Sequence, residues 1–393
     1  MVEKRGISSA PVHGRRVLLR VDFNVPLTTN GQIADDRRIA EALPTLNHLR
    51  TAGARTILLS HLGRPDGHPV PGLSLRPVAH HLSSLLGQPV NFAEEVVGVR
   101  ALERATRLEN GQFLMLENLR FHPGEEANDP AFAASLANLG QVFIEDAFGT
   151  VHRAHASTVG VPKRLPSFAG LLVEREVREL SKLVESPARP YAVLVGGAKV
   201  ADKLPLLTSF LGRADALLIG GALAFPFLAA QGSRLGATSI EAGQKEAVEE
   251  FFRRAVAAGT EVVLPSDVVV ERPDKPEPAV YAVGHLPPGA LARDVGPATR
   301  ARFGEVLSRS KTVFWNGPLG LAEDPRFADG TREVLAHLGG VPGYHVAAGG
   351  DSARVAQDLG VAGSFQFIST GGGAALEFVQ GLELPGLAVL PDA

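Results

Sequence analysis

Short apolar runs alternate with longer amphipathic segments from residue 15 almost to the end of the sequence. In the first half, runs such as "RRVLLRVDF" (15–23) have the length and apolar content of buried strands. Strands that alternate with helical segments of about 10–15 residues indicate βαβ units, and therefore a parallel sheet covered by helices. The expected strands of this half are 15–23, 55–61, 112–118 and 141–148, and the expected helices lie near 37–52, 75–86 and 130–139.

The second half repeats this pattern, and we expect strands at 191–196, 216–220, 261–264, 312–315, 344–348 and 365–369. The chain has 393 residues, whereas single hydrophobic cores stop growing near ~250–300 residues. The sequence therefore predicts an α/β protein of two Rossmann-like lobes, each a parallel sheet flanked by helices. The expected lobes are residues 1–170 and 185–378, joined by a connecting helix at 171–184 in which apolar residues recur at helical spacing.

Composition excludes several classes of function. The chain has no cysteine, which excludes disulfides, thiolate zinc sites and a cysteine nucleophile. Its net charge of −3 is too mild for a nucleic-acid-binding surface. The N-terminus is charged and lacks the apolar core of a signal peptide, and glycines and Pro226 interrupt the longest uncharged run, 216–233. We therefore expect a cytoplasmic protein with neither nucleic-acid nor membrane partners.

Basic side chains follow the expected strands of the first half. In open α/β sheets, ligands bind beyond the carboxyl ends of the strands, and arginine suits bidentate contact with carboxylate and phosphate. Five positions at strand ends or helix starts supply an arginine, which predicts a basic rim for a small anion. The alternative is a solvated rim of ordinary surface residues. The polar residues at these positions are Arg20, Asp22, Asn24, Arg37, Arg38, His61, Arg64, Arg120, His122, Asp146, His152, Arg153 and His155.

Glycine-rich loops follow the expected strands of the second half, among them "VLVGGAKVADK", "VFWNGPLG", "AAGGDSARV" and "STGGGAALE". Glycines let backbone N–H groups approach a ligand closely, and a helix that starts there directs the positive end of its dipole at an anion. Asp351 is placed to hold Mg²⁺, which typically takes one or two carboxylates plus phosphate oxygens. Each signal alone is weak, since a glycine pair is commonly a turn and Asp351 could be a helix cap. Together with Lys199 and Lys203 they favour a nucleotide-phosphate site.

Nothing in the sequence forms a nucleophile–base pair. It has no GxSxG elbow and no HExxH motif. His61, His152 and His155 could act as a base, as metal ligands or as donors to an anion, and their spacing does not match a zinc pattern. The reaction that fits is phosphoryl transfer, in which positioning and charge neutralisation do most of the catalysis.

These motifs resemble those of the phosphoglycerate kinase family. The strings "RVDFNVP", "DDRRI", "SHLGRP", "ENLRFHPGEE", "DAFGTVHRAHAS", "GGAKVADK", "FWNGP", "GGDS" and "STGGGAALEF" occur in the family's order between residues 20 and 378. The resemblance implies reversible phosphoryl transfer between 1,3-bisphosphoglycerate and MgADP, which gives 3-phosphoglycerate and MgATP. It also implies a monomer with the acid on the N-terminal lobe and the nucleotide on the C-terminal lobe. The lobes would close about a hinge at 171–184 and after Gly373, and the tail from about 379 to 393 would pack on the N-terminal lobe.

The resemblance also implies roles for individual residues. On the acid side, Arg20, Asp22, Asn24, His61, Arg64, Arg120 and Arg153 would bind the substrate, and Arg38 would be the catalytic arginine. Lys199 would follow the transferred group, and Gly371, Gly372 and Gly373 would present N–H groups to it. Asp351 would hold Mg²⁺, Glu323 would bind the ribose, and the remaining nucleotide ligands would be Gly197, Lys203, Asn316, Gly349, Gly350, Ser352 and Thr370.

Some positions depart from the family pattern, among them Arg37, Glu145, Ala222 in "IGGALAF" and Ala322 in "LGLAEDP". Ala222 and Ala322 are expected on the nucleotide side, where they bear on affinity and base preference. Three other readings remain: a different carboxylate kinase, a non-catalytic binding module, and a dinucleotide dehydrogenase. A different kinase would not need the whole set of rim arginines, and the dehydrogenase would need a GxGxxG motif that the first strand lacks.

Overall fold

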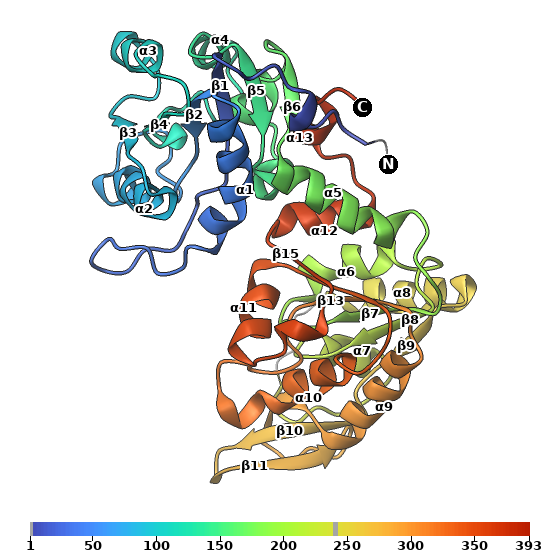
Figure 1. Ribbon diagram of the computed structural model, residues 1–393. Helices are drawn as coiled ribbons and strands as arrows, with labels where there is room; N and C mark the ends of the chain where they lie inside the picture. Colours follow the sequence, from blue (N-terminus) through green and yellow to red (C-terminus); the bar gives the residue numbers. More distant parts are fainter. Residues whose placement is uncertain (1–2, 239–242) are drawn as a thin grey trace. The chain divides into compact units, whose positions relative to one another are not determined.

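The computed structural model describes residues 3–238 and 243–393 of the chain. The chain divides into two compact units, each with its own sheet (Figure 1). Unit 1 comprises Met1–Ser181 together with Leu382–Ala393, and unit 2 comprises Lys182–Gly381. Each unit is a parallel sheet flanked by helices, so the predicted α/β fold class is confirmed.

Unit 1 contains a six-stranded parallel sheet with the order β3-β4-β2-β1-β5-β6. The strands are β1 (Arg16–Arg20), β2 (Arg55–Leu59), β3 (Val90–Ala93), β4 (Phe113–Leu116), β5 (Val142–Glu145) and β6 (Ser167–Ala169). The helices are α1 (Arg37–Thr51), α2 (Arg76–Leu86), α3 (Val99–Thr106), α4 (Pro130–Ala137) and α5 (Leu171–Val184), the last of which continues past the end of the unit.

Two hydrophobic layers cover the faces of this sheet. Successive side chains of a strand point to opposite faces, and along β1 Val17 and Leu19 pack in one layer while Leu18 packs in the other. Side chains of α1 and α2 complete the first layer, and side chains of α3 and α4 complete the second. Because the sheet is buried on both sides, its strands are continuous apolar runs, which is why the sequence shows them so clearly.

Unit 2 contains a second six-stranded parallel sheet, with the order β15-β14-β13-β7-β8-β9. Its strands are β7 (Tyr191–Val195), β8 (Ala216–Ile219), β9 (Glu261–Val263), β13 (Thr312–Asn316), β14 (Tyr344–Ala348) and β15 (Phe367–Ser369). The helices are α6 (Val200–Ser209), α7 (Ala224–Ala230), α8 (Lys245–Ala258), α9 (Pro297–Ser308), α10 (Asp329–Leu338), α11 (Gly350–Asp358) and α12 (Gly373–Gln380). All six strands coincide with predicted ones to within two residues.

Apart from the short helix Pro385–Ala388 near the C-terminus, five strands and one helix of the described residues were not predicted from the sequence. In unit 1 these are β3, β6 and α3, which are short or carry exposed residues. In unit 2 they form a three-stranded antiparallel sheet of β10 (Asp267–Arg272), β11 (Lys275–Ala282) and β12 (Leu291–Val295), in the order β11-β10-β12. Charges and prolines interrupt these strands, and register shifts break both ladders, so the period-2 signal is weak.

The two ends of the described chain are bonded together in unit 1. Arg5 N–H donates to Pro391 O at 2.9 Å, and Ala393 N–H donates to Glu3 O at 2.8 Å. A salt bridge of 2.7 Å joins Lys4 to Asp392. The short helix α13 (Pro385–Ala388) is held to the same unit, since Gly386 N–H donates to Val151 O at 2.8 Å. None of the helices in the described part of the chain combines the length and the hydropathy needed to cross a bilayer.

Candidate active site

The parallel strands of unit 1 bring the predicted basic residues to one edge of its sheet. Arg20 ends β1, while His61, Arg120 and Arg153 follow β2, β4 and β5. The carboxyl ends of parallel strands lie at the same edge, so these segments meet although they are up to about 130 residues apart in sequence. We call this set, together with Asp22, Asn24, Arg38 and Arg64, the basic rim.

Arg20 is the most constrained residue of the basic rim. It is 1% exposed, and its Nε donates to Ser157 Oγ at 2.9 Å. Its Nη1 donates to Val21 O, and its Nη2 lies 3.3 Å from His61 Nδ1. Ser157 in turn donates from Oγ and from N to the buried carboxylate of Glu125, at 2.5 and 3.0 Å. Ser157 and Glu125 thus fix Arg20, and neither received a role from the sequence.

Asp22 connects the catalytic-arginine candidate to this network. Its Oδ2 accepts from Arg38 Nη1 at 2.7 Å, and its Oδ1 lies 4.0 Å from His61 Nδ1. Arg38 lies in the first turn of α1, which explains how it reaches a strand-end residue sixteen positions earlier. Asn24 Oδ1 accepts from Gly63 N–H at 2.9 Å and so joins the β1 loop to the β2 loop.

The other arginines differ in exposure. Arg120 is 3% exposed; its Nη1 donates to Gly63 O at 2.8 Å, and its Nε lies 3.1 Å from Glu126. Arg153 is half-buried and donates to His152 Nε2 at 3.2 Å. Arg64 is exposed. Arg37 binds the carboxylate of Asp35, whose pKa it lowers.

Electrostatics show that the basic rim carries surplus positive charge. Burial, and then Arg20 and Arg120, hold the pKa of His61 well below its usual range, so this imidazole is neutral at neutral pH. Burial followed by Arg120 lowers the pKa of His155 to about 4. Burial also lowers the pKa of Arg120, although Glu126 partly compensates. Because the positive groups depress one another's proton affinity, an anion would be bound favourably here.

Two carboxyls lie under the basic rim at the end of β5. Glu145 and Asp146 are both fully buried, and burial raises the pKa of each to about 8. Burial therefore favours the protonated, neutral form of both carboxyls and weakens the negative charge that Glu145 places beside Arg20. Asp146 accepts from Leu172 N–H at 2.9 Å, at the start of α5.

Unit 2 contains a cavity of about 420 Å³ at which three helices begin. The helices are α6, α11 and α12, and their first residues follow Lys199, Gly349 and Gly372 respectively. Helix N-termini present unpaired N–H groups and a partial positive charge, so their convergence makes an anion site. The lining residues are Gly196, Gly197, Ala198, Lys199, Asp202, Lys203, Asn316, Gly317, Pro318, Gly349, Gly350, Asp351, Ser352, Gly372, Gly373 and Leu376.

Asn316 organises the centre of this cavity. Its Oδ1 accepts from Lys203 Nζ, and its Nδ2 donates to Ala348 O at 2.6 Å. Burial lowers the pKa of Lys203, although Asp202 and Asp351 oppose the shift. Ser352 Oγ accepts from Gly317 N–H at 2.9 Å, so the serine supports the loop after β13.

Two glycines of the cavity are required by geometry. Gly196 packs against the loop after β13, and a Cβ there would lie 2.0 Å from Pro318 O. Gly372 has φ 55° and ψ −124°, a conformation that is essentially confined to glycine. Gly371 and Thr370 are not among the residues that line the cavity, and Gly371 N–H donates to Ser369 Oγ at 3.1 Å. Of the three predicted N–H donors, only Gly372 and Gly373 line the cavity.

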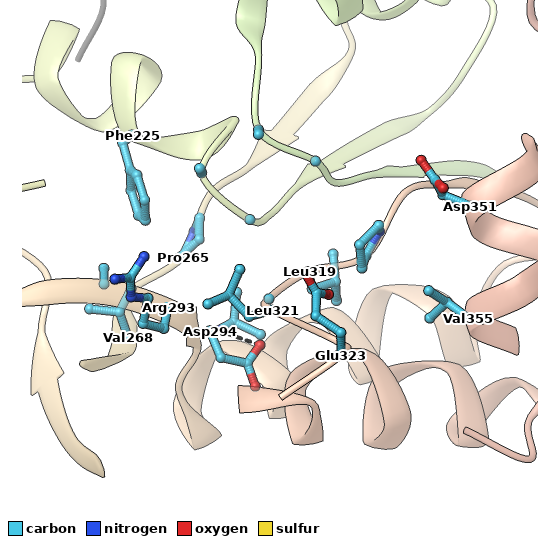
Figure 2. Close-up of a pocket in the computed structure, with 18 of the residues that line it drawn as sticks. Phe225, Pro265, Val268, Arg293, Asp294, Leu319, Leu321, Glu323, Asp351 and Val355 are labelled. Atoms are coloured by element: carbon cyan, nitrogen blue, oxygen red, sulfur yellow. Dashed lines mark hydrogen bonds between the residues drawn. The ribbon is translucent and has the colours of Figure 1, made fainter. Parts of the chain in front are cut away.

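A second pocket of about 340 Å³ adjoins this cavity, and the two share Gly197, Ala198, Pro318 and Asp351. Figure 2 shows its labelled residues, with Asp351 at one end and Phe225 and Arg293 at the other. Glu323 and Ala222 line it, and Ala322 packs against the hydrophobic core of unit 2. Phe225, Arg293 and Asp294 received no role from the sequence analysis, and Arg293 and Asp294 lie in the unpredicted strand β12.

A magnesium ion fits this cavity only with help from a phosphate. In the part of the chain that the structure describes, no three His, Cys, Asp or Glu side chains are grouped as a metal site. Two carboxylates line the cavity, those of Asp351 and Asp202, and Asp351 is the one that the sequence pattern predicts as a ligand. That donor set suits Mg²⁺, which commonly combines one or two carboxylates with phosphate oxygens and water.

Comparison with known proteins identifies the family of the chain that carries the basic rim and the cavity of unit 2. Residues 7–382 match the family model of phosphoglycerate kinase. The phosphoglycerate kinase of Coprothermobacter proteolyticus is 45% identical over 98% of both chains, and that of Herpetosiphon aurantiacus is 44% identical over the full length of both. Among solved structures, phosphoglycerate kinase from Coxiella burnetii superposes with a TM-score of 0.89 at 35% identity, covering 98% of each chain. The chain therefore belongs to the phosphoglycerate kinase family, whose members are phosphotransferases with a carboxyl group as acceptor.

Proposed function

We propose that the chain catalyses reversible, Mg²⁺-dependent transfer of a phosphoryl group between 1,3-bisphosphoglycerate and ADP. The observation that supports this best is the presence of one anion site in each unit. The basic rim of unit 1 suits an acid that carries a phosphate, and the cavity of unit 2 suits a nucleotide phosphate.

The basic rim accounts for binding of the acid. In this proposal Arg20, Arg64, Arg120 and Arg153 hold the phosphate that is not transferred, together with neutral His61. Asp22 and Asn24 bind the glycerate part, where Asp22 is already bonded to Arg38 at 2.7 Å. A small anion of this kind neutralises the neighbouring positive charges that, together with burial as the larger cause, depress the pKa of His61 and Arg120.

The cavity of unit 2 accounts for binding of the nucleotide. Lys203 and Asn316 bind phosphate oxygens from its centre, while Gly197, Gly349, Gly350 and Ser352 surround them. Glu323 accepts from the ribose hydroxyls, and Asp351 is the protein ligand of the magnesium ion. When bound, that ion neutralises charge on the nucleotide phosphates.

The transfer needs no covalent intermediate on the protein. In the direction of ATP formation, an oxygen of the ADP β-phosphate attacks the acyl phosphorus, and the bond from phosphorus to the carboxyl oxygen breaks. Arg38 stabilises charge on the carboxyl oxygens, and Lys199 follows the moving group. The N–H groups of Gly371, Gly372 and Gly373 face it, although Gly371 must first release Ser369. Developing charge is thus met by fixed donors, which lowers the barrier.

The two anion sites belong to different units, so direct in-line transfer requires the units to approach. We propose that α5 and the segment after Gly373 form the hinge, and that closure excludes water from the acyl phosphate. We further propose a cytoplasmic monomer that acts in glycolysis and gluconeogenesis on these small molecules alone, without nucleic-acid or membrane partners.

A coupled assay tests the proposal. The full chain is supplied with 3-phosphoglycerate, ATP and Mg²⁺, and formation of the acyl phosphate is followed. We expect turnover with 3-phosphoglycerate and little with glycerate, which lacks the phosphate that the basic rim would hold. Absence of turnover with 3-phosphoglycerate would refute the proposal. Equal rates with glycerate would favour a different carboxylate kinase.

A further inference from the structure

The 340 Å³ pocket of unit 2 has a polar end and an apolar end. In Figure 2, Asp351 lies at one end, and Phe225, Pro265, Val268 and Arg293 lie at the other, with Glu323 between them. The phosphates, sugar and base of a nucleotide follow one another in that order. With the phosphates at the helix N-termini and the sugar at Glu323, the base lies at the apolar end. This placement rests on the proposed function.

Arg293 is the charged residue at the base end with hydrogen-bonding capacity to spare. Its Nε and Nη2 lie 2.9 and 2.8 Å from a single oxygen, Glu271 Oε2. Within residues 3–238 and 243–393 its guanidinium has no other hydrogen-bond partner. Guanidinium carries five N–H donors in a fixed planar fork, so the Nη1 side stays available. Glu271 therefore orients the fork without saturating it.

The neighbouring acid cannot take this role. Asp294 also lines the pocket, but it is 4% exposed and both of its oxygens are engaged. Oδ1 accepts from Val295 N–H at 2.8 Å, and Oδ2 accepts from Gly330 N–H at 2.7 Å. The other side chains at this end, Phe225, Pro265 and Val268, are apolar and suit the faces of a base rather than its edge.

We propose that Arg293 is a specificity-determining residue that donates hydrogen bonds to the edge of the nucleotide base and favours 6-oxopurines over adenine. Guanine and hypoxanthine present two adjacent acceptors, O6 and N7, which match the arginine fork. Adenine presents the acceptor N7 beside its 6-amino group, and this amino donor opposes the N–H groups of arginine. The substrate class at this site therefore includes guanosine and inosine diphosphates as well as ADP.

The test is a comparison of kcat/KM for ADP, GDP and IDP with the wild-type chain and Arg293→Leu, in the direction of triphosphate formation. We expect Arg293→Leu to lower kcat/KM for GDP and IDP by about ten- to a hundredfold, and to leave that for ADP within about twofold. Arg293→Lys should lose most of the same preference, because an ammonium cannot reproduce the fork.

Arg326→Leu is the matched control. Arg326 is the other guanidinium near Glu271, at 3.6 Å, but it does not line the pocket. If Arg293 acted only in a surface ion-pair network, both variants would change the three substrates alike. An unchanged GDP/ADP ratio in Arg293→Leu would overturn the inference. So would a loss confined to GDP, since IDP shares the 6-oxo group but lacks the 2-amino group.

Calorimetry separates this inference from the proposed function. If the wild-type chain failed to turn over 3-phosphoglycerate with any nucleotide, the proposed reaction would be wrong. The dissociation constants of ADP, GDP and IDP, compared between wild type and Arg293→Leu, would still decide the base preference. Failure of all three nucleotides to bind would overturn the inference as well.

Discussion

Gly372 offers a sharp test of how the loop between β15 and α12 works. It precedes the first residue of α12 with φ 55° and ψ −124°, and a Cβ built there meets no atom within 4 Å. Gly372→Ala therefore fills no occupied space. Its effect comes from the backbone, because a non-glycine residue in such a region costs on the order of 1–3 kcal/mol.

In Gly372→Ala, the loop between β15 and α12 can respond to this backbone strain in two ways. If it keeps its conformation, the cost appears as lost stability, and each kcal/mol lowers the melting temperature of a unit of this size by roughly 2–4 °C. If it relaxes, the N–H groups of Gly372 and Gly373 turn away from the transferred phosphoryl group. A charge-assisted hydrogen bond is worth about 1.5–3 kcal/mol, so kcat falls about ten- to a hundredfold. The dissociation constant of ADP stays within about threefold, since two other helix N-termini still face the phosphates.

Gly381→Ala is the matched control for this variant. Gly381 lies at the other end of α12, with φ 81° and also with no atom within 4 Å of a built Cβ. Gly381→Ala imposes a similar backbone penalty, but Gly381 lies outside the cavity. Calorimetry should show comparable destabilisation of the two variants, and steady-state kinetics should show a loss of kcat for Gly372→Ala alone. A larger loss of ADP affinity than of kcat would refute the reasoning and leave the loop as a plain nucleotide cradle.

Arg38→Ala should lower kcat by roughly 10³-fold, as expected for an arginine that stabilises a phosphoryl transition state, with ADP affinity unchanged because Arg38 belongs to unit 1. Arg37→Ala is the control. Equal losses of kcat in both variants would show that the positive charge of this segment matters for the reaction and that the position of Arg38 does not. Glu145→Gln should change the pH dependence of stability. The pKa of Glu145 rises from 4.5 unfolded to about 8 folded, so its stabilising contribution is complete below pH 4.5 and is lost between pH 4.5 and 8. The pKa of Asp146 is raised in the same way, so Glu145→Gln should remove about half of the fall in melting temperature between pH 5.5 and 7.5. At pH 8 the variant should gain at most about 5 kcal/mol in free energy of unfolding relative to the wild type. An unchanged slope would show that Glu145 is ionised in the folded protein.

The sequence by itself determined the two parallel sheets and the family. The central strands are buried on both faces, so they must be apolar throughout and stand out from the helices between them. The sequence also predicted two helix starts, since helices α12 and α11 begin within "STGGGAALE" and "AAGGDSARV". The strands and helix starts depend on interactions between residues that are close in sequence, so a short stretch of sequence is enough to predict them.

Tertiary structure decided the surroundings of each site residue. Ser157 bonds Arg20, and Glu125 bonds Ser157, only because the segment after β5 and the segment after β4 meet at the end of β1. The pKa of Glu145 follows from burial among groups distant in sequence. Arg293 lines the 340 Å³ pocket from an antiparallel strand with an irregular register, and no period-2 pattern in the sequence indicates that strand. Spacing fixes which residues follow a strand, whereas packing fixes what those residues touch and how they are charged.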